Sequence, residues 1–550
     1  MKRVLLLAAV LAACQSSPLP SVAASPNPVG VRGGDLVMAD WEYPDNLDPL
    51  HATTESDLRV AGLLFEPLWT LDAGLQPLPR LLSEMPVPKL GRGGTMTLDL
   101  NLRPGLRWSD GLPLTADDLI FAVNAICSAG YPGRDRAGFD HIASQERRSP
   151  TEVIWHFGPR PAGSCGLAAN LTSGVYPAWP TMGPLVVPLP AHRLGSIAPA
   201  AWAADPYFQR PDVVSGPFKI SGVVPGRLIQ LAANPDYASG RGRMPWLDGI
   251  TYRVYDGKAA LISGLQTGEA DLGFHLLPAD LPQLADVPIS QSLVTPTLRG
   301  EFVLPNHTAG PWAGDAALLS ALAGSVDPAA LNSAAFNGYA EVSTGLFPPP
   351  LKDYDADPPP GLSVAQAKAA LDADGWTLGA DGVRAKGGRR LAFSLLAICD
   401  DQVRQLEQAE LVRQWGLVGA AVSAVCEPRQ TIFSRLAGGA FEMALLSNAW
   451  PPDPGSWATF GTRAGSLNWG RCSDPGLDAD FAGAAATLDS RARRTGYHAA
   501  AQEWLRQTCS IPLLQWPAVV QRTARLHGFE PNPMLGLDSW NAADWWLSAP

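Results

Sequence analysis

A cysteine near the start of the chain stands where lipid chemistry could act on it. Two basic residues, an apolar run over 4–11 and two alanines lead directly to Cys14. A basic start, a short apolar run and a small-residue cleavage site are typical of a secretory signal, and the run is too short to span a bilayer. The sequence therefore predicts a signal peptide over 1–13, with Cys14 as the lipid-bearing first residue of the mature chain. A plain signal peptide with a chance cysteine is the alternative.

The other six cysteines could form disulfides, because an exported chain enters an oxidising compartment. Proximity along the chain suggests three pairs, which are Cys127 with Cys165, Cys399 with Cys426, and Cys472 with Cys509. Six cysteines allow many connectivities, so spacing does not fix the pairing, and six free thiols are the alternative. None lies in a CxxC or Cys/His cluster, which argues against zinc or redox chemistry. We expect at least two disulfides.

No arrangement of residue types predicts an enzyme. The sequence lacks the GxSxG, HExxH, phosphate-loop and GxGxxG patterns. The 8 histidines are scattered, with no pair at metal-ligand spacing, so no metal or cofactor is expected. Asp353, Asp355 and Asp357 have the spacing that opens a calcium loop, but three prolines follow and Val364 stands where a glutamate is required. We interpret this segment as a solvated acidic loop.

Length and composition describe a multidomain globular protein. The chain has 550 residues, of which 46% are hydrophobic and 17% are charged. This balance is too apolar for a disordered chain, and the length predicts two or three domains. A net charge of −11 without a basic stripe argues against a nucleic-acid partner. Most of the 18 tryptophans are expected in the core, and some could line a cleft for a bulky ligand.

Helical and extended patterns are mixed along the chain. Residues 95–102 alternate apolar and polar side chains, which predicts a strand with one buried face. Thr115 is placed to cap a following helix, and Asp118 to complete a capping box, so these groups are structural. Residues 362–374 predict an amphipathic helix. A strand–helix–strand pattern over 391–426 predicts a parallel pair with a right-handed crossover.

The segment over 102–118, LRPGLRWSDGLPLTADD, carries the most specific signal. It resembles the signature of the extracytoplasmic solute-binding proteins of ABC importers, family 5, the cluster that includes oligopeptide, dipeptide and nickel binders. Supporting matches follow in family order: GGDL with NLDP, SGPFKI, LAANPDY, SGLQTGEADL, LSVAQAKAALDADGW, GGAFEMALLSNAWPPDP and WNAADWWL. The resemblance covers essentially all of the mature chain.

The resemblance implies an α/β, two-lobed periplasmic-binding-protein-like fold of type II, with an extra subdomain on lobe I. The expected segments are the signal peptide over 1–13, a lipid-anchored linker over 14–32, lobe I over 33–51, 187–278 and 514–550, its subdomain over 52–186, and lobe II over 279–513. Because the chain would cross between the lobes twice, a hinge that closes around a ligand is mechanically feasible.

The resemblance also points to residues that would hold a ligand. In peptide-binding relatives an aspartate upstream of an Asp-Pro or Glu-Pro pair meets the ligand's α-amine. Aligned on Asp453 and the following proline, that position is Trp450 here, and an indole lacks the carboxylate that a buried ammonium requires. Either Asp453 takes the role, or the ligand lacks a fixed α-amine. Arg404 and Arg435 fall near positions that bind the ligand's carboxylate in relatives, and each could instead be a solvated surface charge.

Further candidates fall on segments that border the cleft in relatives: Trp41, His51, Thr53, Thr54, Asn448, Trp457 and Trp516. Stacked indoles would favour an apolar, aromatic or sugar-like ligand, and core packing is the alternative for each.

These expectations combine into a monomeric, lipid-anchored receptor that captures a small solute and delivers it to the permease subunits of an ABC transporter. It would work in the periplasm or at the outer face of the cell membrane, without covalent chemistry. A peptide or peptide-like solute is expected, with a modified or aromatic solute as a close alternative. A receptor that serves a sensor, and an extracytoplasmic hydrolase, are the rival functions.

Overall fold

The computed structural model describes residues 30–549 except 51, 53, 92–93, 129, 132–137, 159–173, 238–243, 286–289, 344, 399–401 and 464. Five of the residues singled out from the sequence therefore lie outside the described residues: Cys14, His51, Thr53, Cys165 and Cys399. Within the described part of the chain, no helix is both long and apolar enough to cross a membrane.

One 11-stranded mixed sheet runs through the whole molecule, in the order β18-β17-β19-β12-β20-β11-β1-β10-β9-β8, with β13 paired to β20. Its strands are β1 (Asp35–Asp40), β8 (Phe218–Val224), β9 (Leu228–Ala233), β10 (Gly249–Val254), β11 (Leu272–Leu276), β12 (Ser290–Pro305), β13 (Glu341–Val342), β17 (Ala392–Ile398), β18 (Ala421–Glu427), β19 (Met443–Ala449) and β20 (Ile511–Thr523). β1 is parallel to β10 and β11, and β17 is parallel to β18 and β19.

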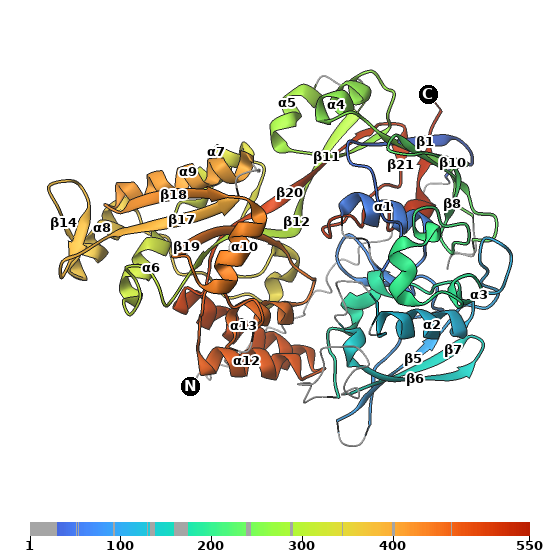
Figure 1. The fold of residues 1–550 in the computed structure, drawn as a ribbon, viewed down its shortest axis with the longest axis horizontal. Helices are drawn as coiled ribbons and strands as arrows, with labels where there is room; N and C mark the ends of the chain where they lie inside the picture. Colours follow the sequence, from blue (N-terminus) through green and yellow to red (C-terminus); the bar gives the residue numbers. More distant parts are fainter. Residues whose placement is uncertain are drawn as a thin grey trace, which may run out of the picture.

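Two bodies lie on either side of the long antiparallel pair β12 and β20 (Figure 1). The first body contains β11, β1, β10, β9 and β8, and the second contains β18, β17 and β19. The β12–β20 register shifts between Pro296 and Gly300, where the ladder is locally interrupted. The register shifts again between Glu301 and Phe302, so the ladder is least regular over 296–302. The predicted α/β two-lobed fold is the observed one, and the predicted segment limits stay a prediction.

The first body carries a separate four-stranded sheet: β4 (Lys89–Leu90), β5 (Met96–Asn101), β6 (Ile142–Ser149) and β7 (Glu152–Phe157). The predicted alternation is confirmed, because the apolar side chains of β5 are buried and the polar ones are half-buried. The capping box that opens α2 (Ala116–Ile126) is also confirmed. Asp118 accepts the Thr115 backbone N–H at 2.9 Å and that of Ala191 at 3.1 Å, so it ties the helix to a distant segment.

Helices and short strands complete the first body. They are α1 (Glu55–Leu64), α3 (Ala191–Leu194), α4 (Lys258–Gln266), α5 (Leu281–Leu284), and the strands β2 (Trp69–Leu71), β3 (Pro77–Pro79), β21 (Leu526–His527) and β22 (Trp546–Leu547). The 3₁₀ segment η3 (Trp179–Leu185) packs against β2 and faces the second body.

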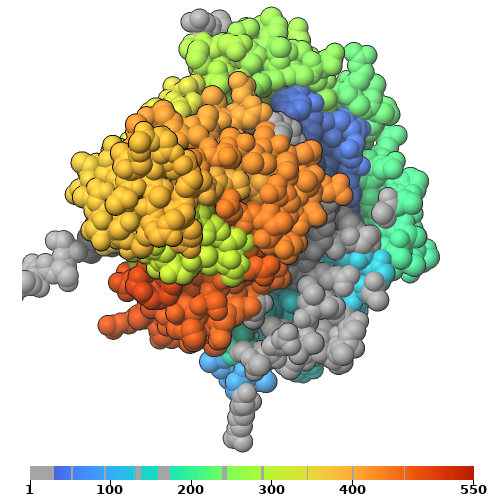
Figure 2. All heavy atoms as spheres, turned by 60° about the vertical axis from the view of Figure 1, so that its left-hand side comes forward, coloured from blue at the N-terminus to red at the C-terminus, as the bar shows by residue number. Residues whose placement is uncertain are grey.

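Helices cover the second body, which faces the viewer in Figure 2 with the first body behind it. They are α6 (Ala316–Gly324), α7 (Pro328–Phe336), α8 (Val364–Ala373), α9 (Gln402–Leu417), α10 (Arg429–Gly438), α11 (Ala458–Gly461), α12 (Pro475–Ala485) and α13 (Ser490–Gln507), with a small sheet of β14 (Thr377–Leu378), β15 (Arg384–Lys386) and β16 (Arg389–Arg390). The parallel pair β17–β18, with α9 between the two strands in the chain, confirms the predicted parallel pair, and the hand of the crossover stays a prediction.

A disulfide joins Cys472 and Cys509 at the two ends of the α12–α13 hairpin, with their Cα atoms 5.4 Å apart. This is one of the three pairs that proximity along the chain suggested. Cys127 and Cys426 are also disulfide-bonded, and the partner suggested for each lies outside the described residues.

Asp355 departs from the prediction of a solvated acidic loop. Its neighbours Asp353 and Asp357 are exposed, but Asp355 is half-buried and accepts backbone N–H groups from Leu346, Phe347 and Ala356 at 2.9–3.1 Å. A carboxylate that accepts several backbone donors holds a loop in place, so this aspartate is a structural group.

Candidate ligand-binding site

A cavity of about 520 Å³ lies between the two bodies and takes its walls from both. His141 and residues between Tyr176 and Leu185 form the wall of the first body. The wall of the second body comes from the end of β19, the segment that follows it, and the helices α12 and α13. The volume is within the range of small-molecule sites in proteins, which are typically about 300–1,000 Å³.

Two stacked indoles form the centre of the second-body wall. The ring of Trp450 lies 4.1 Å from that of Trp457, with an interplanar angle of 14°. Phe460 meets the edge of Trp450 at 4.8 Å. Trp450 lines the cavity, whereas Trp457 is 1% exposed and lies behind it, outside the lining. Trp450 is therefore the candidate contact, and Trp457 holds it in place.

The first-body wall is also built from stacked rings. His141 lies on Tyr176, with ring centroids 4.0 Å apart and an angle of 23° between the planes. Tyr176 in turn stacks on Phe157, at 6.2 Å and 20°. Burial lowers the pKa of His141, so this ring is neutral at pH 7. A ligand in the cavity thus meets aromatic side chains on both sides.

The carboxylate in the cavity, that of Asp453, already has partners. It forms an ion pair with Arg493 on α13, and it accepts the Gly455 backbone N–H at 2.9 Å. Burial raises the pKa of Asp453, while the Arg493 charge opposes this shift. Asn448, another predicted contact, also lines the cavity. The structure therefore brings Asn448, Trp450 and Asp453 together in one site.

Trp41 and Trp516 line a second cavity, of about 180 Å³, beside the connecting strands. Trp41 is 44% exposed, and its Nε1 donates to the backbone oxygen of His275 at 3.3 Å. The guanidinium of Arg299 lies 3.9 Å from the centre of the Trp516 ring, and its Nε donates to Ser447 at 3.2 Å. Trp41 and Trp516, both predicted to contact a ligand, therefore line a different cavity from Trp450.

A charged cluster supports the second cavity. His275, at a φ of +54°, places its Nδ1 2.7 Å from Asp40 Oδ1. Burial by itself would lower the pKa of His275, but its hydrogen bonds to Asp40 and Glu55 outweigh burial and raise the pKa to about 9. Burial by itself would raise the pKa of Asp40. Its hydrogen bond to His275 and the positive charge of Arg59 outweigh burial and lower this pKa to about 2. His275 is therefore protonated at pH 7 and bonded to an ionised carboxylate.

Neither predicted arginine lines these two cavities. Arg404 is 2% exposed and contacts Glu301 at 2.6 Å and Glu407 at 3.9 Å. Arg435 pairs with Glu427 at 2.8 Å, near the C-terminal end of α10. The structure places Arg404 inside the second body and Arg435 on its surface, so each already has an anionic partner.

Thr54, predicted as a cleft residue, begins α1 as its N-cap. Its side chain accepts the Asp57 backbone N–H at 3.1 Å, and the Asp57 carboxylate accepts the Thr54 N–H at 3.3 Å. This capping box gives Thr54 a structural role.

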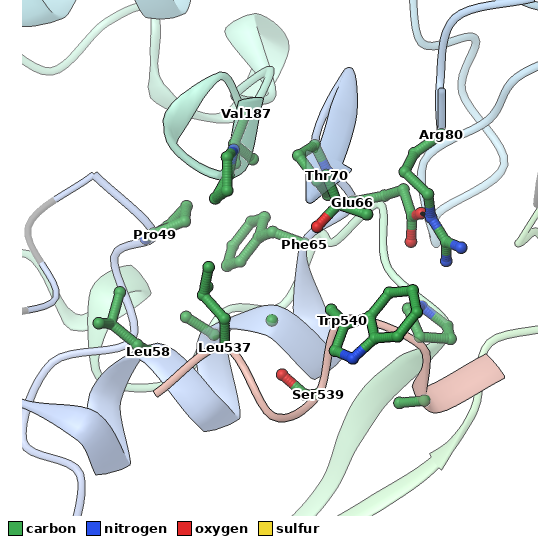
Figure 3. A pocket seen from close by; sticks show the side chains of 16 residues that line it. Pro49, Leu58, Phe65, Glu66, Thr70, Arg80, Val187, Leu537, Ser539 and Trp540 are labelled. Atoms are coloured by element: carbon green, nitrogen blue, oxygen red, sulfur yellow. Dashed lines mark hydrogen bonds and ion pairs between the residues drawn. The ribbon is translucent and has the colours of Figure 1, made fainter. Parts of the chain in front are cut away.

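A third cavity, inside the first body, is shown in Figure 3 and measures only about 50 Å³. Phe65, Leu58 and Leu537 surround it, and the buried ion pair of Glu66 and Arg80 lies at its edge. A space of this size holds a few water molecules at most, since one water needs about 10–15 Å³ of it, so it is a packing void and not a solute site.

Several site residues escaped the sequence reasoning: His141, Tyr176, Phe460, Arg493, Tyr497 and Arg299. None belongs to a local motif. Each reaches its cavity through contacts between segments far apart in the chain, so a single sequence carries no local signal for it.

Known proteins resemble this chain in sequence and in fold. The oligopeptide-binding protein AppA of Bacillus subtilis is 25% identical over 378 residues, which are 68% of this chain and 65% of that protein, just under two thirds. The structure of AppA from Bacillus subtilis with a nonapeptide matches with a TM-score of 0.72 and 22% identity, over 94% of this chain and all of that chain. NikZ from Campylobacter jejuni, in complex with Ni(L-His), matches with a TM-score of 0.71 and 19% identity, over 93% and 99% of the two chains.

The sequence model of one family covers residues 93–467, which is more than half of the chain. These residues include strands β5, β6 and β7 of the four-stranded sheet, the first-body wall of the larger cavity, the part of its second-body wall up to Leu467, and most of the second body. A cavity with walls from two bodies can enclose a solute when the bodies close around it. The chain therefore belongs to the bacterial extracellular solute-binding proteins, family 5, which are binding proteins and not enzymes.

Proposed function

We propose that this protein is a lipid-anchored receptor that binds a peptide or peptide-like solute between its two bodies and delivers it to the permease of an ABC transporter. The observation that carries the proposal is the cavity of about 520 Å³ with walls from both bodies. The oligopeptide-binding relative and the nonapeptide in the related structure support a peptide-like solute.

A solute held by both walls favours closure, because it contacts both only when the bodies are together. The register interruption in β12 and β20 near 296–300 is where bending would occur. A ligand that changes a two-state population from mostly open to mostly closed must prefer the closed state by about 5.5 kcal/mol. Two aromatic walls can supply a preference of this size, since burying one aromatic side chain removes about 150–250 Å² from water.

The anchor would be a lipid on Cys14, which the segment over 15–32 would connect to the folded bodies as an extended tether. This arrangement keeps the receptor beside the membrane, where a permease accepts its solute. The first 32 residues would thus serve export and attachment, and the rest of the chain would bind the solute.

Native mass spectrometry of the soluble form that begins after Cys14 tests the binding function. The expected result is a defined additional mass that is lost on denaturation and that identifies the solute. Peptide addition should also raise the unfolding temperature, because a ligand at 100 times its Kd stabilises the folded state by about 2.7 kcal/mol. A protein without a retained solute, and without a thermal shift from any peptide, would contradict the proposal.

A further inference from the structure

We propose that the larger cavity accepts an uncharged, flat apolar group of the solute, such as an aromatic ring, and that it does not bind a free amine or carboxylate. The inference rests on the proposed function and narrows the class of solute. Its basis is the charge balance of the cavity and the arrangement of its rings.

The charges that face the cavity cancel within the protein. Among the described residues that line it, the ionisable ones are His141, Tyr176, Asp453, Arg493 and Tyr497. His141 is neutral, for the reason given above, and burial keeps the Tyr497 hydroxyl protonated by raising its pKa. Asp453 and Arg493 neutralise each other as a buried ion pair, with side chains 14% and 8% exposed. The lining therefore offers no net charge to a solute.

A free ammonium group would lack a partner in this cavity. It would have to compete for Asp453 with the Arg493 guanidinium and with the Gly455 N–H. A solute that displaced the guanidinium would leave a buried cation without its carboxylate, which is strongly unfavourable. A solute carboxylate would lie beside the ionised Asp453, which bonds Arg493 through Nη2 and repels a second anion, although the buried Nη1 of Arg493 has no hydrogen-bond partner among the described residues.

The rings, in contrast, favour a flat apolar group. Trp450 is supported from behind by Trp457, and Tyr176 by Phe157, so each stacked pair is held by the core of its own body. Pre-organised rings lose little side-chain entropy on binding, and offset-stacked or edge-to-face contacts between rings are favourable. The cavity is large enough for a bicyclic ring and closes with rings on both sides.

Three probes with the same ring separate charge from shape: naphthylmethanol, naphthylmethylammonium and naphthoate. Calorimetric titration of the mature chain should give a Kd for the neutral alcohol at least about tenfold lower than for either ion. Trp450→Ala should raise the Kd of the alcohol about tenfold or more. Trp546→Ala is the matched control, because this tryptophan lies in strand β22 and does not line the larger cavity. It should leave the Kd of the alcohol unchanged.

Reciprocal variants of the ion pair give a second readout. Asp453→Asn leaves the Arg493 charge without its carboxylate and should improve naphthoate binding about tenfold over that of the unmodified protein. Arg493→Gln leaves the carboxylate and should improve binding of the ammonium probe by a similar factor. Circular dichroism of each variant shows whether it is folded before its Kd is compared.

Equal or tighter binding of the ammonium probe, or an unchanged Kd in Trp450→Ala, would overturn the inference. If naphthylmethanol neither binds nor competes with a bound peptide, in a protein that does bind peptides, the inference is overturned and the proposed function stays intact. A protein that binds neither peptides nor any of the three probes would refute both.

Discussion

Replacing Arg404 by alanine should destabilise the protein and leave its affinity for a solute unchanged. The resemblance to peptide-binding relatives suggested that this arginine binds a ligand's carboxylate. The structure instead places it between Glu301 and Glu407, and the side chains of these three residues are 2%, 0% and 0% exposed. Its Nη2 also donates to Ser447 at 2.9 Å, which fixes the guanidinium inside the second body.

The magnitude follows from the burial of both carboxylates. Removing one member of a buried ion pair typically costs about 3–5 kcal/mol, because the remaining charge is left without compensation. Here two glutamates lose the same cation, so the upper part of that range is expected for Arg404→Ala. The double variant Glu301→Gln with Arg404→Met removes one of these charges together with the cation and should be less destabilised than Arg404→Ala.

Urea unfolding followed by circular dichroism measures the free energy of unfolding of the unmodified protein, Arg404→Ala and the double variant. Titration with the solute identified by mass spectrometry, or with naphthylmethanol, measures affinity in each folded variant. We expect Kd values within about twofold of one another. An Arg404→Ala protein that keeps its stability but loses affinity would refute this reasoning and restore the arginine to the ligand site.

Three further predictions concern residues elsewhere. Because the pKa of His275 is raised from 6.5 to about 9, its stabilisation is fully present below pH 6.5 and is lost as the pH rises through 9, by about 3 kcal/mol. In His275→Asn, where asparagine tolerates the positive φ, the free energy of unfolding measured with urea should change less between those pH values. The same pH dependence as in the unmodified protein would contradict the raised pKa of His275. Changing Cys472 and Cys509 together to serine should lower the free energy of unfolding by about 4 kcal/mol, because the disulfide closes a 37-residue separation. Cys14→Ser should move the exported protein from the membrane fraction to the soluble fraction, and unaltered fractionation would exclude a lipid on this residue.

Local features of this chain could be predicted from its sequence because they depend on residues a few positions apart. The capping box at Thr115, the alternating strand over 96–101 and the parallel strand pair around α9 are of this kind. The ordered series of family motifs added the two-lobed fold, which the structure confirms. The missing catalytic patterns argued against an enzyme, and the family resemblance pointed to a binding protein, in agreement with the family model.

Only the tertiary structure decided which partner each charged side chain finds. The pairs Asp453–Arg493, Arg404–Glu301 and His275–Asp40 are separated by 40, 103 and 235 positions. An arginine next to a buried glutamate stabilises the fold, whereas the same residue facing a cleft could bind a ligand, and both have the same appearance in a sequence. Long-range packing also decides that Trp41 and Trp516 line one cavity and Trp450 another, because each cavity is built from segments far apart in the chain. Side-chain type sets what a residue can do, and long-range packing sets what it meets.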